Sequence, residues 1–149
     1  MKKWLMAGIT LLTTFYCIAQ TSPVRWVFAA KKIADKTYEL RLTATVAAPW
    51  HIYSQETPEG GPLPTKISFT KNPLVTLESS PQEKGKLIKK FEEVFDVNVL
   101  YFDRDAEFVQ LVKLKSNVKT RISGSIEFMA CNDVQCLPPS QVPFQIELN

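Results

Sequence analysis

The strongest structural signal in the chain is the alternation in Thr37-Tyr38-Glu39-Leu40-Arg41-Leu42-Thr43-Ala44-Thr45-Val46. Apolar and polar side chains follow one another with a period of two, which is typical of a β-strand with one buried face and one face in water. Residues 24–33, just upstream, are rich in apolar and aromatic side chains, and residues 34–36 suit a turn. The two runs together predict a β-hairpin.

Shorter strands are expected along the rest of the chain, separated by proline, glycine and asparagine. They lie at residues 66–70, 75–78, 94–102, 108–115, 121–129 and 142–148. A turn or two of helix is expected only at residues 84–91, and the Pro/Gly-rich residues 57–64 are expected to form a long surface loop. Roughly seven to nine short strands with regular turn signals predict an all-β fold, an immunoglobulin-like antiparallel β-sandwich.

The N-terminus has the layout of a secretory signal peptide. Lys2 and Lys3 form a short basic start, and residues 4–17 are uncharged and mostly apolar. We therefore expect residues 1–20 to be removed and residues 21–149 to form one mature domain. The alternative, an uncleaved anchor, is disfavoured because a membrane-spanning helix needs about 20 apolar residues.

Composition and charge narrow the classes of function. Without Lys2 and Lys3 the chain keeps 16 basic residues against 15 acidic ones, a balance that gives no sign of binding to nucleic acid or to a membrane surface. No other stretch is long and apolar enough for the mature chain to insert into a membrane. Cys17 is expected to leave with the signal, because the bulky Phe15 and Tyr16 disfavour lipidation at that cysteine. Export places the mature domain in the periplasm or outside the cell, where disulfides persist.

The two remaining cysteines, Cys131 and Cys136, are the candidate reactive residues. The intervening Asn132-Asp133 suits a tight turn that brings the two sulfur atoms together. A disulfide that closes so short a loop stabilises the folded state by only about 2 kcal/mol in the chain-entropy model, and a chain with its own core has little need of it. Spacing alone leaves two roles open, a structural clip and a redox pair that exchanges with partners.

Other chemistries have weaker support, and neither a metal ion nor a cofactor is expected. A zinc site needs ligands beyond two thiolates, and the single histidine, His51, lies about 80 residues upstream of Cys131. His51 is interpreted as a packing residue at a strand end, and nothing in the sequence brings it beside a cysteine, as cysteine-protease chemistry would require. No basic residue adjoins the pair and Asp133 lies inside it, so a strongly acidified thiol is not expected.

Three segments carry a resemblance to a known family. They are Trp-His-Ile-Tyr-Ser at residues 50–54, Gly-Pro-Leu-Pro-Thr-Lys-Ile at residues 61–67, and above all Cys-Asn-Asp-Val-Gln-Cys-Leu-Pro-Pro at residues 131–139. In order and over nearly the whole mature chain, the sequence resembles the N-terminal periplasmic domain of the thiol:disulfide interchange protein DsbD. The resemblance implies an immunoglobulin-like fold with a redox-active cysteine pair, in which Cys136 forms the mixed disulfide with partners and Cys131 resolves it.

The same resemblance implies partners and a protective loop. Domains of this family take electrons from a membrane-embedded thiol reductase by way of a thioredoxin-like domain, and pass them to thioredoxin-like and other thiol proteins of the periplasm. An aromatic side chain on a cap loop shields their cysteine pair until a partner docks. The similar position in this sequence comprises Glu93, Val94 and Phe95, which makes Phe95 the expected shield, with Phe91 as the second choice. The alternative is that Phe95 is an ordinary core residue of its strand.

Two departures from the family pattern affect these expectations. The best-known members have one more residue between their cysteines. The 149 residues also include neither the transmembrane module nor the thioredoxin-like domain, so the electron donor is expected on another polypeptide. The leading hypothesis is therefore a periplasmic relay of the protein-disulfide reductase type. The alternative is a non-enzymatic binding module in which a structural disulfide locks a recognition loop.

Overall fold

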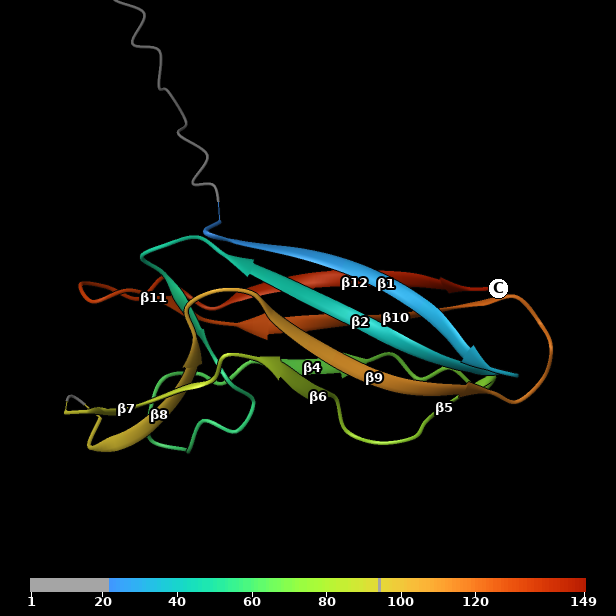
Figure 1. The fold of residues 1–149 in the computed structure, drawn as a ribbon, viewed down its shortest axis with the longest axis horizontal. Coiled ribbons are helices and arrows are strands. Elements are labelled where there is room, and N and C mark those ends of the chain that lie inside the picture. Colours follow the sequence, from blue (N-terminus) through green and yellow to red (C-terminus); the bar gives the residue numbers. More distant parts are fainter. Residues whose placement is uncertain (1–21, 94) are drawn as a thin grey trace, which may run out of the picture.

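The structure, a computed structural model, describes residues 22–93 and 95–149, and within those residues every regular element is a β-strand (Figure 1). The strands are β1 (Val24–Ala34), β2 (Thr37–Val46), β3 (His51–Tyr53), β4 (Lys66–Phe69), β5 (Val75–Leu77), β6 (Gln82–Gly85), β7 (Ile88–Glu92), β8 (Val97–Phe102), β9 (Ala106–Leu114), β10 (Thr120–Phe128), β11 (Ala130–Cys131) and β12 (Ser140–Leu148). All the pairings between them are antiparallel.

The strands form three sheets. In the first, β1, β2 and β9 lie side by side, and the short strands β5 and β6 pair with successive parts of β9. The second has the order β12-β10-β4. These two sheets pack face to face along the length of the molecule, while the third, β11-β3-β8-β7, lies at one end (Figure 1). The predicted all-β, immunoglobulin-like antiparallel sandwich is confirmed.

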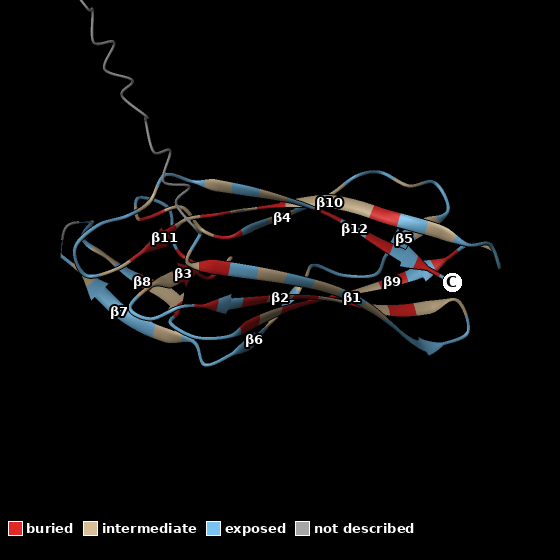
Figure 2. Ribbon diagram, turned by 90° about the horizontal axis from the view of Figure 1, so that it is seen from above, coloured by how far each residue is buried: buried red, intermediate tan, exposed pale blue. Residues whose placement is uncertain are grey.

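The core lies between the two long sheets and follows directly from the alternation in the sequence. Leu40 and Leu42 of β2 and Phe108 of β9 are fully buried, and they face Ile126 of β10 and Leu148 of β12 across the sandwich. The edge strand β1 is exposed at alternate positions until its last four residues, which are all exposed, and the tan and pale-blue segments of this strand in Figure 2 follow this pattern. One face of each long strand is thus removed from water, which is the main source of stability in a sandwich of this kind.

Gly124 allows three strands and an aromatic ring to meet at one point. A Cβ atom at this position would lie 2.2 Å from the backbone oxygen of Ser68 on β4 and 2.5 Å from Cζ of Phe144 on β12. Phe144 packs in turn against Phe69, with ring centroids 5.5 Å apart. The absence of a side chain at Gly124 is therefore a packing requirement of the second sheet.

The predicted strands and the observed strands agree in most of the sandwich. The hairpin of β1 and β2 is present, with a short turn at Asp35 and Lys36. Strands β4, β5, β8, β9, β10 and β12 lie within or close to the predicted ranges. Strand β8 begins three residues later than expected, because Glu93, Phe95 and Asp96 belong to the turn before it, where Asp96 has a positive φ of 54°.

The helical turn expected at residues 84–91 is wrong. This segment contains the end of β6 and most of β7, which pair with β9 and β8 respectively. Gly85, the last residue of β6, has a φ of 141°, a backbone conformation that does not occur in a right-handed helix. Backbone hydrogen bonds to neighbouring strands outweigh the modest helix propensity of the lysines and leucine in this segment.

The remaining predictions concern the loop at residues 57–64 and the N-terminus. The loop has no strand, and its inner side is anchored because Thr57 Oγ1 donates a hydrogen bond to the carbonyl of Leu100 at 2.8 Å. The expected signal peptide at residues 1–20, including Cys17, lies outside the described residues. In the part of the chain that the structure describes, no helix is long and apolar enough to span a membrane.

Candidate functional site

The end sheet β11-β3-β8-β7 has two different faces. One face completes the main core with Ile52, Phe102 and Ala130. The other face carries a separate small cluster in which Tyr53, Val99 and Cys131 are buried. Because side chains alternate across a strand, each short strand of this sheet contributes to both faces. Cys131 therefore lies on the outer face of a sheet whose inner face is held by the core.

Cys131 and Cys136 form a disulfide across a tight hairpin. The S–S distance is 2.02 Å and the two Cα atoms are 4.0 Å apart. The backbone makes its own bonds on either side of the pair: the amide of Asn132 donates to the carbonyl of Gln135, and the amide of Leu137 donates to the carbonyl of Ala130, each at 2.9 Å. The hairpin is thus closed by backbone hydrogen bonds as well as by sulfur.

The Asn132 side chain shapes the turn between the cysteines. Its Oδ1 accepts hydrogen bonds from the amides of Val134 and Gln135, at 2.9 and 2.8 Å. An asparagine side chain in this role replaces a backbone carbonyl and stabilises a turn without help from the rest of the fold. Four residues between the cysteines are therefore enough for a closed turn.

The two cysteines differ sharply in exposure. Cys131, on β11, is 1% exposed, whereas Cys136 belongs to the exposed class of residues. Strand β11 holds Cys131 against β3, and Leu137, which packs against the main core, fixes the chain just after Cys136. One sulfur-bearing residue therefore faces solvent while its mate is covered by protein.

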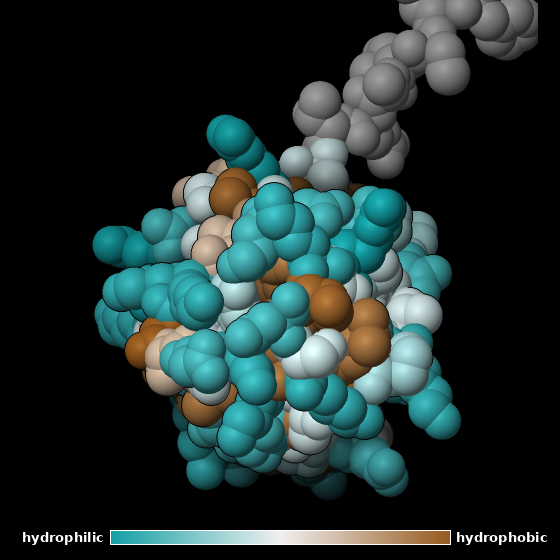
Figure 3. Space-filling model, turned by 90° about the vertical axis from the view of Figure 1, so that its right-hand side faces the viewer, coloured by the Kyte–Doolittle hydropathy of each residue, from teal (hydrophilic) through white to brown (hydrophobic). Residues whose placement is uncertain are grey.

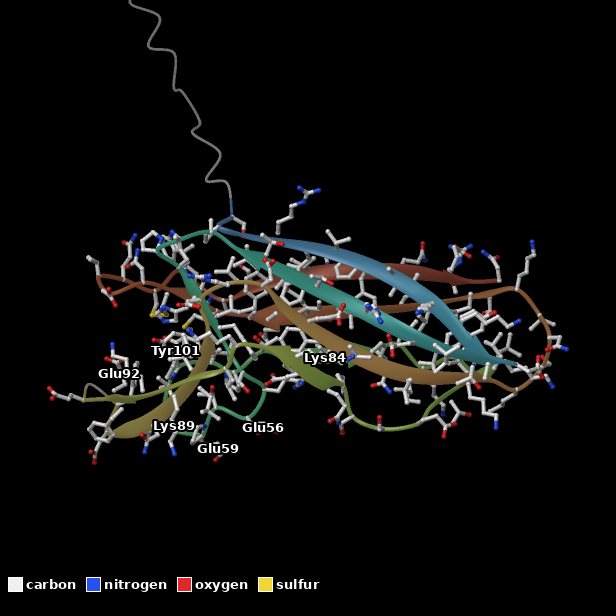
Figure 4. The ribbon with its side chains drawn as sticks, in the orientation of Figure 1. Glu56, Glu59, Lys84, Lys89, Glu92 and Tyr101 are labelled. Carbon is white, nitrogen blue, oxygen red and sulfur yellow. A yellow bond between two sulfur atoms is a disulfide. The ribbon has the colours of Figure 1, made fainter. Side chains whose placement is uncertain are left out.

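The disulfide borders a cleft with a volume of about 550 Å³. Both cysteines line it, together with His51 and Tyr53 from β3 and Phe95 from the turn after β7. Glu92, at the end of β7, also lines the cleft, and Figure 4 places it at the same end of the molecule as Tyr101 and the yellow sulfur atoms.

The opposite end of the molecule offers no comparable chemistry. It presents mostly hydrophilic residues, with hydrophobic ones exposed among them (Figure 3). Two smaller hollows there, of about 220 and 290 Å³, are lined by neither cysteine nor histidine. The cleft beside the disulfide is therefore the candidate site.

The predicted cap residues have different positions. Phe95 lies in the turn between β7 and β8, is 39% exposed and lines the cleft with both cysteines, so the alternative of a core residue is wrong. Glu93 is exposed in the same turn, and Val94 lies outside the described residues. Phe91 is 52% exposed and alternates along β7 with the cleft-lining Lys90 and Glu92, which turns it away from the cleft.

Sequence reasoning missed the position of His51. In the antiparallel pairing of β3 with β11, His51 is the direct partner of Cys131. Its Nε2 is 3.1 Å from the hydroxyl oxygen of Tyr53, and its ring centroid is 4.6 Å from that of Tyr101. Strand β3 has three residues, which is too short for periodicity to reveal it. The one pattern in the sequence that pointed to this arrangement was the two-residue spacing of His51 and Tyr53, which places both side chains on the same face of a strand.

Burial keeps both polar rings of β3 uncharged at neutral pH. Desolvation lowers the pKa of His51 below its ordinary value, and the nearby positive charge of Lys90 adds to this effect, whereas Asp133 acts in the opposite direction. Desolvation raises the pKa of Tyr53 to about 12, with a smaller contribution from Glu92. The cleft therefore holds a neutral imidazole hydrogen-bonded to a neutral phenol.

A metal site has no support in the described part of the chain. In residues 22–93 and 95–149, no group of three or more histidine, cysteine, aspartate and glutamate side chains is arranged to hold a metal ion. The disulfide, the imidazole and the phenol line the cleft together with the charged side chains of Lys90, Glu92 and Asp133.

Solved structures share the fold at low sequence identity. The DsbD N-terminal domain of Neisseria meningitidis in the reduced form has a TM-score of 0.52 and 18% identity, covering 83% of this chain and 86% of that one. The N-terminal periplasmic domain of ScsB from Proteus mirabilis has a TM-score of 0.57 and 15% identity, covering 89% of this chain and 49% of that one. At these identities the likeness concerns the fold alone.

A third solved structure contains the same type of domain bound to another protein. It is the complex of the DsbD N-terminal domain with the PilB N-terminal domain of Neisseria meningitidis, with a TM-score of 0.52 and 14% identity, covering 87% of this chain and 86% of that one. No curated protein matches the chain by sequence.

A family model identifies the chain more specifically. The model described as thiol:disulfide interchange protein DsbD, N-terminal, matches residues 19–147. This match covers almost the whole described domain, including the cysteine hairpin and the cap turn. The chain therefore belongs to the family of DsbD N-terminal domains.

Proposed function

We propose that this domain is a thiol–disulfide relay in which Cys136 exchanges with partner proteins and Cys131 resolves the mixed disulfide. Membership of the DsbD N-terminal family supports exchange chemistry in general. The specific assignment of roles is supported by one observation above all, the unequal exposure of the two cysteines. A partner's sulfur must approach in line with the disulfide, and solvent exposure favours approach at Cys136.

The proposed reaction has two exchange steps. In the reduced domain the Cys136 thiolate attacks a partner disulfide, forming a bond between Cys136 and one partner sulfur while the other partner sulfur leaves as a thiolate. Cys131 then attacks Cys136, the bond to the partner breaks, and the partner leaves fully reduced. Two electrons pass from the domain to the partner, and the domain ends in the oxidised form that the structure describes.

The proposed setting is the periplasm, with residues 1–20 as a secretory signal and residues 21–149 as the mature domain. The proposed partners are thioredoxin-like periplasmic proteins, and a membrane-embedded thiol reductase that restores the dithiol. The solved complex of a DsbD N-terminal domain with the PilB N-terminal domain supports docking of this fold to another protein.

The proposed docking face is the end that carries Phe95 and Val134, of which Val134 is 91% exposed at the hairpin tip. Phe95, beside the pair, is proposed as the shield of the disulfide between encounters.

A binding module with a purely structural disulfide is less well supported. The hairpin already has two backbone hydrogen bonds across the cysteine pair and two more to Asn132 Oδ1. A disulfide in so short a loop adds only about 2 kcal/mol to the free energy of unfolding. The bond is therefore in a place where it stabilises little and is reachable from solvent.

Trapping tests the assignment directly. The Cys131→Ala variant, reduced and mixed with a thioredoxin-like protein that carries a single cysteine activated as its nitrothiobenzoate disulfide, should release nitrothiobenzoate and accumulate a mixed disulfide through Cys136, visible on a non-reducing gel. The Cys136→Ala variant is the matched control and should accumulate none. Equal trapping by both variants, or trapping only through Cys131, would contradict the assignment.

Redox titration tests the relay itself. Equilibration of the wild-type domain with glutathione mixtures should convert the pair between dithiol and disulfide at a potential above about −300 mV, the level below which structural disulfides resist reduction. A pair that stays oxidised well below that potential would support the structural alternative.

A further inference from the structure

We propose that His51 is the proton acceptor for the Cys131 thiol when that thiol resolves a mixed disulfide. The inference rests on the proposed function, because it gives His51 a role in the second of the two exchange steps. It concerns a residue that the spacing of the cysteines does not reveal and that reaches the pair only through the pairing of β3 with β11.

The first support is the placement of the two side chains. His51 and Cys131 are direct partners in an antiparallel pair, and such partners project from the same face of a sheet with Cβ atoms about 4.5–5.5 Å apart. Both residues line the same cleft. An imidazole nitrogen and a thiol sulfur, each extending from its Cβ, are therefore within reach of one another.

The second support is the burial of Cys131. At 1% exposure its thiol has little access to water that could take the proton. A thiol must be deprotonated before it attacks, because the thiolate is the nucleophile. Burial among apolar groups raises the pKa of a thiol, which makes a nearby base more valuable at this cysteine than at the exposed Cys136.

The third support is the state of the imidazole. Burial keeps His51 neutral at pH 7, so it has a free lone pair. Its Nε2 lies 3.1 Å from the Tyr53 hydroxyl, and in the tautomer in which Nε2–H donates to that oxygen, Nδ1 is left as the acceptor. Tyr101, whose ring lies 4.6 Å from that of His51, restricts the rotation of the imidazole.

Charged groups near His51 offset part of the desolvation that disfavours a positive charge on its ring. The titratable groups that face it are Tyr53, Tyr101, Lys90, Glu92, Asp103 and Asp133. The three carboxylates favour the imidazolium that forms on proton transfer, and the single ammonium opposes it. A neutral base that becomes charged only during the reaction is the arrangement that general-base catalysis needs.

The proposed step balances in atoms and charge. The Cys131 thiol gives its proton to Nδ1 of His51, which becomes imidazolium. The Cys131 thiolate forms a bond to the sulfur of Cys136, and the bond from Cys136 to the partner breaks with the electron pair leaving on the partner sulfur. The imidazolium then releases its proton to solvent or to the departing thiolate.

The step can be measured without a biological partner. The reduced domain is mixed with excess dithiobis(nitrobenzoate), a disulfide whose leaving thiolate is coloured. Attack by Cys136 releases the first coloured thiolate, and resolution by Cys131 releases the second. The rate of each release is followed by stopped-flow absorbance between pH 6 and about 9.5 for the wild type, His51→Gln and Tyr53→Phe.

We expect the second release from His51→Gln to be about tenfold slower than from the wild type at pH 7. For a thiol of ordinary pKa, about 8.5, the upper limit is about thirtyfold, because about 3% of it is already ionised at that pH, and burial of Cys131 moves this limit upward. The difference should shrink as the pH rises toward 9.5, where more of the thiolate forms without a base. The first release should be unchanged, and Tyr53→Phe should show a smaller slowing with the same convergence.

The outcomes separate the possibilities. An unchanged second release, or a slowing by the same factor at every pH, would overturn the role of His51. If His51→Gln also slows the first release, the fold of that variant is disturbed, and Tyr53→Phe becomes the test. A second release from Tyr53→Phe that approaches the wild-type rate at high pH supports the proposal. A slowing by the same factor at every pH overturns it. A pH-dependent effect of His51 together with failure of Cys131→Ala to trap any partner would overturn the relay and leave the His51 assignment standing. The absence of a second release from the wild type would overturn both.

Discussion

The long sandwich and the small end sheet are both built from antiparallel strands, but they differ in strand length and in how much of each strand is buried. In the sandwich, strands of nine and ten residues bury most of one face, and the side chains of Leu40, Phe108 and Ile126 are fully enclosed. In the end sheet, strands of two to six residues bury only part of each face and leave an open cleft. Stability is concentrated in the first region and accessibility in the second. The disulfide of Cys131 and Cys136 can therefore be accessible at the end sheet with little loss in the free energy of unfolding.

The largest expected effect comes from the sandwich. Phe108→Ala should lower the free energy of unfolding by about 3–5 kcal/mol, because a fully buried ring that packs against Trp26 and Phe102 is lost and a cavity is left. Urea denaturation followed by fluorescence measures the change. Phe91→Ala is the matched control: Phe91 is 52% exposed, so its removal should cost less than about 1 kcal/mol. Similar losses in the two variants would remove the distinction between the regions.

A second change tests the packing of the sandwich from the opposite direction. Gly124→Ala adds one methyl group where a Cβ atom would lie 2.2 Å from the backbone of Ser68, so the strands must move apart, at an expected cost of about 1–3 kcal/mol. Ser125→Ala, at the next position along β10, should change the midpoint of denaturation little. Equal midpoints for the two variants would show that β4 and β10 approach less closely than described.

Reduction of the disulfide tests the end sheet. With dithiothreitol present, the free energy of unfolding of the wild type should fall by no more than about 2 kcal/mol, because the bond closes a short loop that backbone hydrogen bonds also hold. The reduced protein should keep its circular dichroism spectrum. A loss as large as that of Phe108→Ala would mean that the end sheet supports the whole fold.

The smallest expected effect is a pH dependence of stability at His51. Its pKa is lowered in the folded state, so the unfolded state binds the proton more readily. The stabilisation is complete above the unfolded value of about 6.5, and it is lost as the pH falls through the lower folded value. Between pH 7 and pH 5 the oxidised wild type should lose slightly more stability than His51→Gln in urea denaturation. An equal or smaller loss in the wild type would contradict the direction of the shift.

Sequence patterns predicted the two regions unequally. Strands β2, β9, β10 and β12 are long enough for alternation to be visible, and their inward residues form the core. Strands β3, β7 and β11 of the end sheet, and β6 at the edge of the sandwich, have two to five residues, and they exist because neighbouring strands supply hydrogen bonds, which no local pattern encodes.

The candidate site divides in the same way. The cysteine pair and the turn at Asn132 are local features, so spacing and turn chemistry were sufficient to find them. The partnership of His51 with Cys131 joins residues about 80 positions apart and depends on the register of two very short strands. The position of Phe95 beside the cysteine pair was predicted only from the family resemblance. Its neighbours in the sequence were equally compatible with a core position.

The backbone bonds that close the cysteine hairpin have a consequence for the lifetime of any complex made through Cys136. None of them involves sulfur, so in the proposed relay we expect them to hold the turn after the sulfur–sulfur bond is broken, with Cys131 beside Cys136 at an effective concentration far above that of any dissolved thiol. The proposed covalent intermediate with another protein would then be short-lived, because the turn keeps the resolving thiol beside the bond that it must attack.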